Sequence, residues 1–148
     1  MSGEETVKQY MRANNVHEEH MHFDRSCHSV KEAAHASRED FVKNICMLGE
    51  GLIVAVVKGE DRASTDHVSK ALQIRRQRLA SPQEILETTG YPAGGVPSFG
   101  FRATFLIDPN VVKRDIVYTG GGSENSLVKI AAKELKKANN GLVVRVRK

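Results

Sequence analysis

The sequence predicts a single compact domain of the α/β class (mixed α+β), with helices packed on a mixed β-sheet. Runs with the two-residue period of strands and runs with helical spacing follow one another in an irregular order. No Pro-, Gly- or Ser-rich linker divides the chain, and its 148 residues suffice for one hydrophobic core but are few for two. We therefore expect one domain over residues 1–148, with residues 1–16 as an N-terminal helical extension.

The first half of the chain predicts a helix followed by strands. Apolar residues recur at helical spacing within residues 6–15, and residues 18–23 alternate as a half-buried strand does. The apolar runs 41–48 and 52–59 flank a Gly-Glu-Gly turn, so they predict a β-hairpin.

The second half adds helices and further strands. The clearest helix signal is SPQEILETTG, in which Ser81 and Glu84 form a capping box and Gly90 ends the helix. A weaker pattern predicts a helix that begins with Thr65 or Asp66 as its cap. The other expected elements are strands over residues 102–108, 115–119 and 142–148 and a helix over residues 131–141.

The composition predicts a cytosolic protein. The chain is 40% apolar and 27% charged, and its net charge of +4 permits a polyanionic partner without requiring one. Its 2 cysteines form no CxxC pair, which favours reduced thiols. The N-terminus is acidic and polar, unlike a signal peptide, and the longest apolar run, residues 52–57, is too short to span a bilayer.

A histidine-rich stretch, HEEHMHFDRSCH at residues 17–28, suggests a metal site. His20 and His22 share one strand face, and Cys27 and His28 follow. Zinc needs three or four such ligands that converge on one point. The spacing matches no zinc finger, and HEEH is one residue short of HExxH. We therefore expect no metal; a strand whose solvent face carries histidines is the simpler interpretation.

Two glycine-rich loops and one lysine are better candidates for function. The loops are GYPAGGVPSFGF, residues 90–101, and TGGGS, residues 119–123. Glycine lets the backbone approach a ligand and aim N–H groups at anionic oxygens. Neither loop has Walker or GxGxxG spacing, so two plain turns are the alternative. Lys43 lies in the otherwise apolar run 41–48, either at an exposed edge or in a pocket that holds a phosphate or carbonyl oxygen.

Four segments carry a resemblance to a known family: FVKNICML, SPQEILETTGYPAGGVPSFG, FLID and VYTGGGSENSLVKI. In order and spacing they resemble the YbaK family of aminoacyl-tRNA editing domains, over nearly the whole chain from His20. The TGYPAGGVP block is the most specific part. The resemblance implies a YbaK-like α/β fold that uses no metal or other cofactor. It also implies hydrolysis of the ester of mischarged tRNA that carries a small residue such as Cys or Ala, on the proline tRNA.

The resemblance also assigns site residues and partners. The family's catalytic lysine falls on Lys43, and Ser98 stands where many relatives carry proline. Mischarged tRNA is the implied partner, an aminoacyl-tRNA synthetase is a further candidate, and no membrane is implicated. The implied substrate-binding residues are Gly94, Gly95, Val96, Pro97 and Ser98 in the first loop and Gly120, Gly121 and Gly122 in the second.

No Ser/His/Asp arrangement or other general base is evident in the sequence. We therefore expect substrate-assisted hydrolysis, in which the terminal ribose hydroxyl or a cysteine side chain of the substrate takes part. Loop N–H groups would stabilise the oxyanion, and Lys43 would hold a phosphate or the carbonyl oxygen. Six basic residues could contact tRNA phosphates, or they could simply be solvated surface charges. They are Arg75, Arg76, Arg78, Arg145, Arg147 and Lys148.

Three other functions remain open at this point. A module of the same fold would hold aminoacyl-tRNA or a synthetase without hydrolysis. A metalloprotein built on the N-terminal histidines would contain stoichiometric zinc. A nucleotide-binding domain that uses the glycine loops would bind free nucleotides tightly, with no dependence on an attached amino acid.

Overall fold

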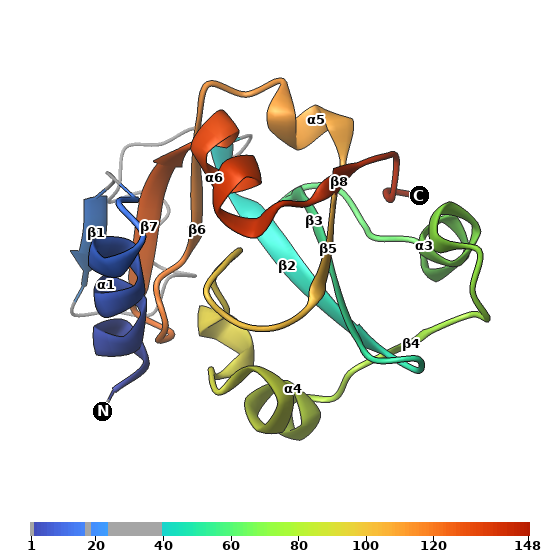
Figure 1. Cartoon of the computed structure of the whole chain (residues 1–148), viewed down its shortest axis with the longest axis horizontal. Helices are drawn as coiled ribbons and strands as arrows, with labels where there is room; N and C mark the ends of the chain where they lie inside the picture. Colours follow the sequence, from blue (N-terminus) through green and yellow to red (C-terminus); the bar gives the residue numbers. More distant parts are fainter. Residues whose placement is uncertain (1, 17–18, 24–39) are drawn as a thin grey trace.

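Two β-sheets, with helices around them, make up the fold in the computed structural model (Figure 1). The structure describes residues 2–16, 19–23 and 40–148. In the described part, no helix has both the length and the apolar character needed to cross a membrane.

The larger sheet has five strands in the order β4-β2-β3-β5-β8 and is mixed, as expected. β2 (Val42–Leu48) and β3 (Leu52–Lys58) form the predicted antiparallel hairpin. β3 then pairs in parallel with β5 (Thr104–Ile107), and β5 pairs in parallel with β8 (Leu142–Val143). The short β4 (Arg78–Leu79) closes the other edge against β2.

The smaller sheet is antiparallel, in the order β1-β7-β6. Its strands are β1 (Glu19–His22), β7 (Ser126–Ala131) and β6 (Ile116–Gly120). The sequence patterns predict β1 and β6 but no strand at β7, although β7 is the central strand. Leu127, Val128 and Ile130 are all buried, so β7 lacks the alternation that marks a half-exposed strand.

The helices follow local capping signals closely. In α4 the hydroxyl of Ser81 accepts from the N–H of Glu84, whose carboxylate accepts in return from the N–H of Ser81. In α3 the cap is Ser64, not Thr65 or Asp66, and its hydroxyl accepts from the N–H of His67. The helices are α1 (Gly3–Ala13), α3 (Thr65–Leu72), α4 (Pro82–Thr89), η2 (Ala93–Gly95), α5 (Pro109–Val112) and α6 (Ala132–Asn139).

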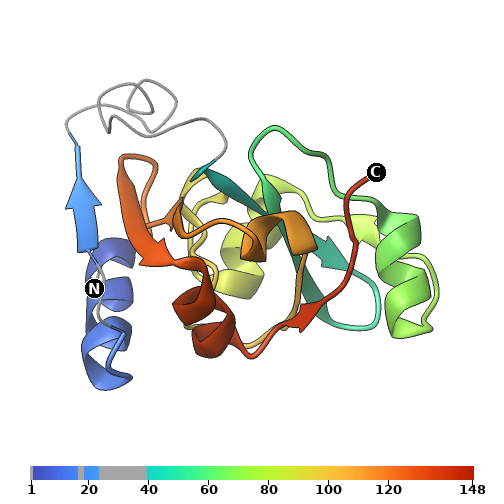
Figure 2. The ribbon, with the colours of Figure 1, turned by 90° about the horizontal axis from the view of Figure 1, so that it is seen from above.

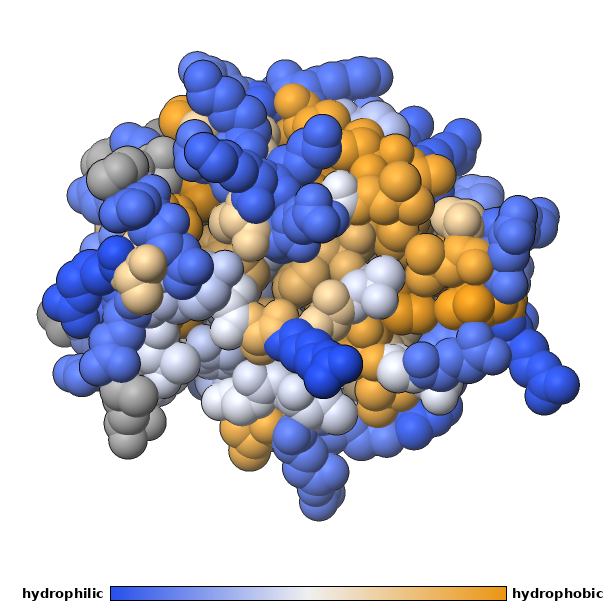
Figure 3. Space-filling model, viewed as in Figure 1, coloured by the Kyte–Doolittle hydropathy of each residue, from blue (hydrophilic) through white to orange (hydrophobic). Residues whose placement is uncertain are grey.

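The N-terminal and C-terminal segments are both anchored to the rest of the fold. In α1, Val7 and Met11 are buried in the main hydrophobic cluster, and Figure 2 shows α1 and β1 together at one side of the molecule. At the other end, the predicted strand over residues 142–148 is regular only in β8. Beyond β8, the buried carboxylate of Asp108 accepts hydrogen bonds from the N–H groups of Val146 and Arg147. Apolar side chains gather on the face seen in Figure 3, beside β8, where Leu142 is half exposed.

Candidate active site

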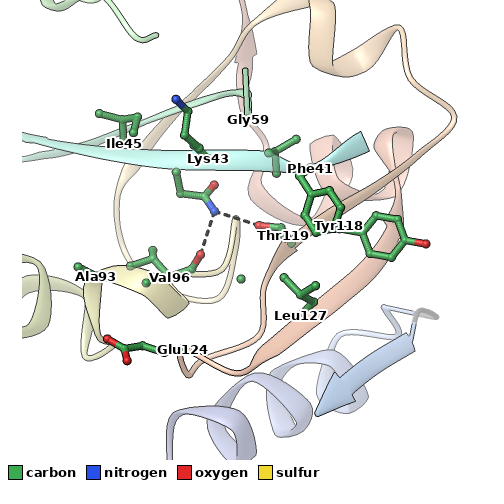
Figure 4. Close-up of a pocket in the computed structure, with 14 residues that line it drawn as sticks. Phe41, Lys43, Ile45, Gly59, Ala93, Val96, Tyr118, Thr119, Glu124 and Leu127 are labelled. Carbon is green, nitrogen blue, oxygen red and sulfur yellow. Dashed lines mark hydrogen bonds between the residues drawn. The ribbon is translucent and has the colours of Figure 1, made fainter. Parts of the chain in front are cut away.

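A cavity of about 670 Å³ opens where the two sheets approach each other (Figure 4). β2 and β6 belong to different sheets, and a parallel bridge joins Phe41, which directly precedes β2, to Tyr118 in the middle of β6. The stacked rings of these two residues, with centroids 5.1 Å apart, form part of the wall. The lining residues are Phe41, Val42, Lys43, Asn44, Ile45, Gly59, Ala93, Gly94, Val96, Tyr118, Thr119, Gly120, Glu124 and Leu127.

The cavity brings together four of the residues that the sequence predicts for the site: Lys43, Gly94, Val96 and Gly120. Gly95, Pro97, Ser98, Gly121 and Gly122 are not among the lining residues; they belong to the two loops behind the wall. Lys43 therefore lines the same cavity as residues of both glycine loops. The catalytic and substrate-binding roles of all nine residues stay predictions.

Successive side chains of β2 point to opposite faces, which separates Lys43 from Asn44. Lys43 is half-buried, opposite Val57 of β3. Figure 4 shows its side chain rising from β2 on the side away from Val96 and Thr119. The amide of Asn44 makes the contact with the loops instead.

A closed ring of hydrogen bonds joins Asn44, Thr119 and Ser98. Nδ2 of Asn44 donates to Oγ1 of Thr119 at 2.9 Å, and Oγ of Ser98 donates to Oδ1 of Asn44 at 2.6 Å. The two hydroxyls are 2.7 Å apart, so Thr119 donates to Ser98 and completes the ring. Ser98 is 0% and Thr119 1% exposed, so water reaches neither hydroxyl.

The second N–H of Asn44 fixes the first glycine loop, because it donates to the carbonyl oxygen of Val96 at 2.8 Å. On the far side, Nδ2 of Asn139 donates to the carbonyl oxygen of Ser98 at 2.9 Å. Sequence reasoning assigned Ser98 to the site but missed Asn44 and Thr119. A signal was present for Asn44: an amide between Val42 and Cys46 on an apolar face must find partners when buried.

The glycines of the loops serve contacts between backbones. A Cβ on Gly95 would lie 2.6 Å from the backbone of Ser123, and one on Gly120 would collide with the carbonyl oxygen of Val96. The two loops can therefore touch only while these positions lack side chains. The N–H of Gly95 donates to Pro92, that of Gly122 to Gly95 and that of Gly121 to Ser126, all to carbonyl oxygens. In this conformation these three N–H groups are not available to an oxyanion.

The histidine-rich stretch forms no metal centre among the described residues, where no group of three or more His, Cys, Asp or Glu residues is placed to hold an ion. Cys27 and His28 lie outside those residues. His20 and His22 do share one face of β1, as predicted, but His20 is not on a solvent face. Its side chain is 7% exposed, and its Nε2 is 2.8 Å from the carbonyl oxygen of Gly121.

Two charged side chains, Lys43 and Glu124, are among the lining residues of the cavity in the described part of the chain. Elsewhere, three of the six basic residues considered for tRNA contact already pair with carboxylates. Arg76 pairs with Asp66, Arg78 with Glu84 and Arg147 with Asp108, at 3.3, 2.6 and 2.8 Å.

Comparison with known proteins adds an independent finding. The sequence model of one family, the aminoacyl-tRNA editing domain, matches residues 24–138. The chain is 30% identical to the uncharacterized protein YwhH of Bacillus subtilis (strain 168) over 133 aligned residues, in a match that covers 86% of this chain and 82% of that protein. It is 30% identical to a proline--tRNA ligase of Anaeromyxobacter sp. (strain Fw109-5) over 90 residues, which are 60% of this chain but 16% of the ligase.

A solved structure described as a trans-editing enzyme candidate for prolyl tRNA synthetase has the same fold. Its TM-score is 0.91 at 22% identity, and the match covers 100% of this chain and 98% of that chain. The family match spans well over half of the sequence and includes Lys43 and both glycine loops. The chain belongs to the aminoacyl-tRNA editing domain family, as its YbaK-like motifs predict.

Proposed function

We propose that this protein is a trans-editing hydrolase that deacylates mischarged tRNA. Its substrate would be the proline tRNA that carries a small residue such as Cys or Ala. One observation carries the proposal: in a chain of the editing family, Lys43 and residues of both glycine loops line a single cavity. The likeness to a proline--tRNA ligase and to a trans-editing candidate supports the choice of tRNA. A synthetase is a further partner in this proposal, and no cofactor takes part.

The two charged lining residues match the two charges of the proposed substrate. An aminoacyl ester has an ammonium group on one side of the carbonyl and a nucleotide phosphate on the other. Lys43 would hold the phosphate or the carbonyl oxygen, and the exposed carboxylate of Glu124 would attract the ammonium group. Both contacts would fix the ester in one orientation, which lowers the entropic part of the barrier.

In the proposed reaction, water attacks the carbonyl carbon and the bond to the ribose oxygen breaks. The proton from water ends on that oxygen, and the products are the free amino acid and tRNA. Among the residues that the structure describes, the lining includes no histidine or cysteine, and the Ser98 and Thr119 hydroxyls are bound within the ring. We therefore assign the assisting group to the substrate, as the neighbouring ribose hydroxyl or, in a Cys ester, the thiol.

The volume of the cavity bears on what enters it. About 670 Å³ is within the range of small-molecule sites and is more than an alanine or cysteine side chain fills. The cavity would thus take the aminoacyl group together with part of the terminal nucleoside. Selection against larger aminoacyl groups would then depend on the part of the cavity wall where Val96, Thr119 and Gly120 meet, because steric exclusion of a larger group is strong.

Deacylation of a panel of tRNAs charged with Ala, Cys, Ser, Thr and Pro tests the proposal. Lys43→Met removes the ammonium and keeps most of the apolar stem, and Lys70→Met makes the same change at an exposed site on α3. We expect one or two small-residue esters to be hydrolysed by the wild type and by Lys70→Met. Lys43→Met should lose at least about a hundredfold in rate. If the wild type hydrolyses no ester above the spontaneous rate, the proposed deacylase activity is refuted.

A module that holds aminoacyl-tRNA without hydrolysis is the second candidate. The observation that favours it is the absence of a histidine or cysteine among the described lining residues. The same panel separates the two, since the module would protect the ester in a binding assay and leave its lifetime unchanged or longer.

A further inference from the structure

The N-terminal segment, residues 2–16 and 19–22, contacts the second glycine loop directly. The family match begins at residue 24, so this segment lies outside the part that the family describes. It approaches the loop from two elements, the first turn of α1 and the strand β1. The contacts join residues about a hundred positions apart in the sequence.

His20 makes the first contact. On β1 it is paired with Val128 of β7, which directs its side chain toward the loop that precedes β7. Its Nε2 lies 2.8 Å from the carbonyl oxygen of Gly121, and the side chain is 7% exposed. Because a carbonyl oxygen can only accept, Nε2 carries the hydrogen and donates it. A buried donor of this kind resists displacement by water.

Glu4 makes the second contact, from the first turn of α1. Its carboxylate is 2.9 Å from the hydroxyl of Ser123 and 2.9 Å from Nδ1 of His22. One carboxylate oxygen is also 4.0 Å from Nε2 of His20. Burial raises the pKa of Glu4, but the hydrogen bonds from Ser123 and His22 outweigh it and hold the pKa below its usual value. The carboxylate is therefore an anion that accepts hydrogen bonds.

A backbone contact completes the arrangement. Gly122 has φ +101, and a Cβ on it would collide with the backbone of Gly3, as would a Cβ on Gly3 with the carbonyl of Gly122. The N–H of Gly122 donates to the carbonyl oxygen of Gly95 at 2.8 Å. The N-terminal segment thus packs on the second loop, and the second loop is bonded to the first. Gly94 and Gly120, which flank these contacts, both line the cavity.

We propose that His20 and Glu4 are positioning residues that hold the Gly120–Ser123 loop against the cavity, which makes the N-terminal segment part of the editing site. The contact itself is independent of the proposed function, but its expected effect on substrate selection rests on that function. Without the two side chains, the loop moves away from Gly95, the wall at Gly120 loosens and the cavity admits larger residues. Discrimination between small and large aminoacyl groups then falls more than stability does.

His20→Ala tests the role, and His67→Ala is its matched control. The ring of His67 also bonds a carbonyl oxygen at 2.8 Å, that of Arg147, but on α3. The measurement is the ratio of kcat/KM for an alanine ester to that for a larger ester. We expect His20→Ala to lower this ratio about tenfold, with His67→Ala within about twofold of the wild type. His20→Gln keeps a donor and should restore most of the ratio. An unchanged ratio in His20→Ala would overturn the role.

Hydrogen exchange of the Gly122 amide provides a readout that is independent of activity. We expect exchange in His20→Ala to be at least about tenfold faster than in the wild type or in His67→Ala. An unchanged exchange rate would refute the role of His20 in holding the loop. Faster exchange in a protein that hydrolyses no ester would support that role and refute only the proposed enzymatic activity. If His20→Ala does not fold, Glu4→Gln replaces it, because the amide keeps the shape of the carboxylate and removes its charge. The same two readouts then decide.

Discussion

Ser98 donates a hydrogen bond from its hydroxyl to Oδ1 of Asn44 at 2.6 Å, across the boundary between the first glycine loop and β2. The bond gives the fully buried hydroxyl of Ser98 a partner within the protein. Its hydroxyl both donates to Asn44 and receives from Thr119, so all three side chains are satisfied inside the protein. The ring joins β2, the first loop and β6, which are the elements that form the cavity.

Ser98→Ala should destabilise the protein by about 1–3 kcal/mol, because Oδ1 of Asn44 and the hydroxyl of Thr119 each lose a buried partner. Urea unfolding measures the loss. Ser69→Ala is a suitable control, since the Ser69 hydroxyl bonds the carbonyl oxygens of Thr65 and Arg75, away from the ring. Equal stability of Ser98→Ala and the wild type would show that the ring contributes nothing.

Asn44→Asp should reduce deacylation at least about tenfold and raise KM. The substitution keeps the shape of the side chain but places an oxygen where Nδ2 now lies, 2.8 Å from the carbonyl oxygen of Val96. Two acceptors at that distance repel each other, so the loop at Val96 must move. Steady-state kinetics on the preferred ester checks this. Asn14→Asp, at the exposed C-cap of α1, should leave both constants unchanged.

Local signals explain which parts of the fold were predictable. The capping box of α4 and the turn between β2 and β3 are encoded within a few residues, and both predictions are confirmed. β7 was missed because burial on both faces removes its alternation. Sequence reasoning placed Lys43 beside the loops through resemblance alone. It could not find the ring, since 54 residues separate Ser98 from Asn44 and 75 separate Thr119 from Asn44.

The position of His20 shows the same limit more sharply. Alternation in residues 18–23 predicts correctly that His20 and His22 share a face. It cannot tell whether that face meets solvent or protein, because Gly121 lies 101 residues away in the sequence. Only the pairing of β1 with β7 decides that the face meets the loop.

Cys46 should resist alkylation in the native protein. It is buried, and burial raises the pKa of its thiol to about 11. At pH 8 roughly one thiol in a thousand would be ionised, and the thiolate is the form that reacts. Mass spectrometry of the peptide that contains Cys46, after iodoacetamide treatment, should show modification in denaturant but not in native buffer. Rapid native labelling would contradict the burial.

Asp108 should make the stability of the protein depend on acid pH. Burial raises the pKa of its carboxyl, but the hydrogen bonds from the N–H groups of Asn110, Val146 and Arg147 and from the Arg147 guanidinium outweigh burial and lower it. A lowered pKa in the folded state means that this stabilisation is complete above the unfolded value of about 3.9 and is lost as pH falls through the folded value.

Asp108→Asn should cost about 1.5–3 kcal/mol at neutral pH and flatten this acid limb. Urea unfolding between pH 2 and pH 7 measures both effects. Asp66→Asn, on the exposed face of α3, is the control that should leave the limb unchanged. An acid limb of equal slope in Asp108→Asn would mean that other carboxylates set the acid stability, and that the C-terminal segment is held chiefly by its apolar contacts through Val146.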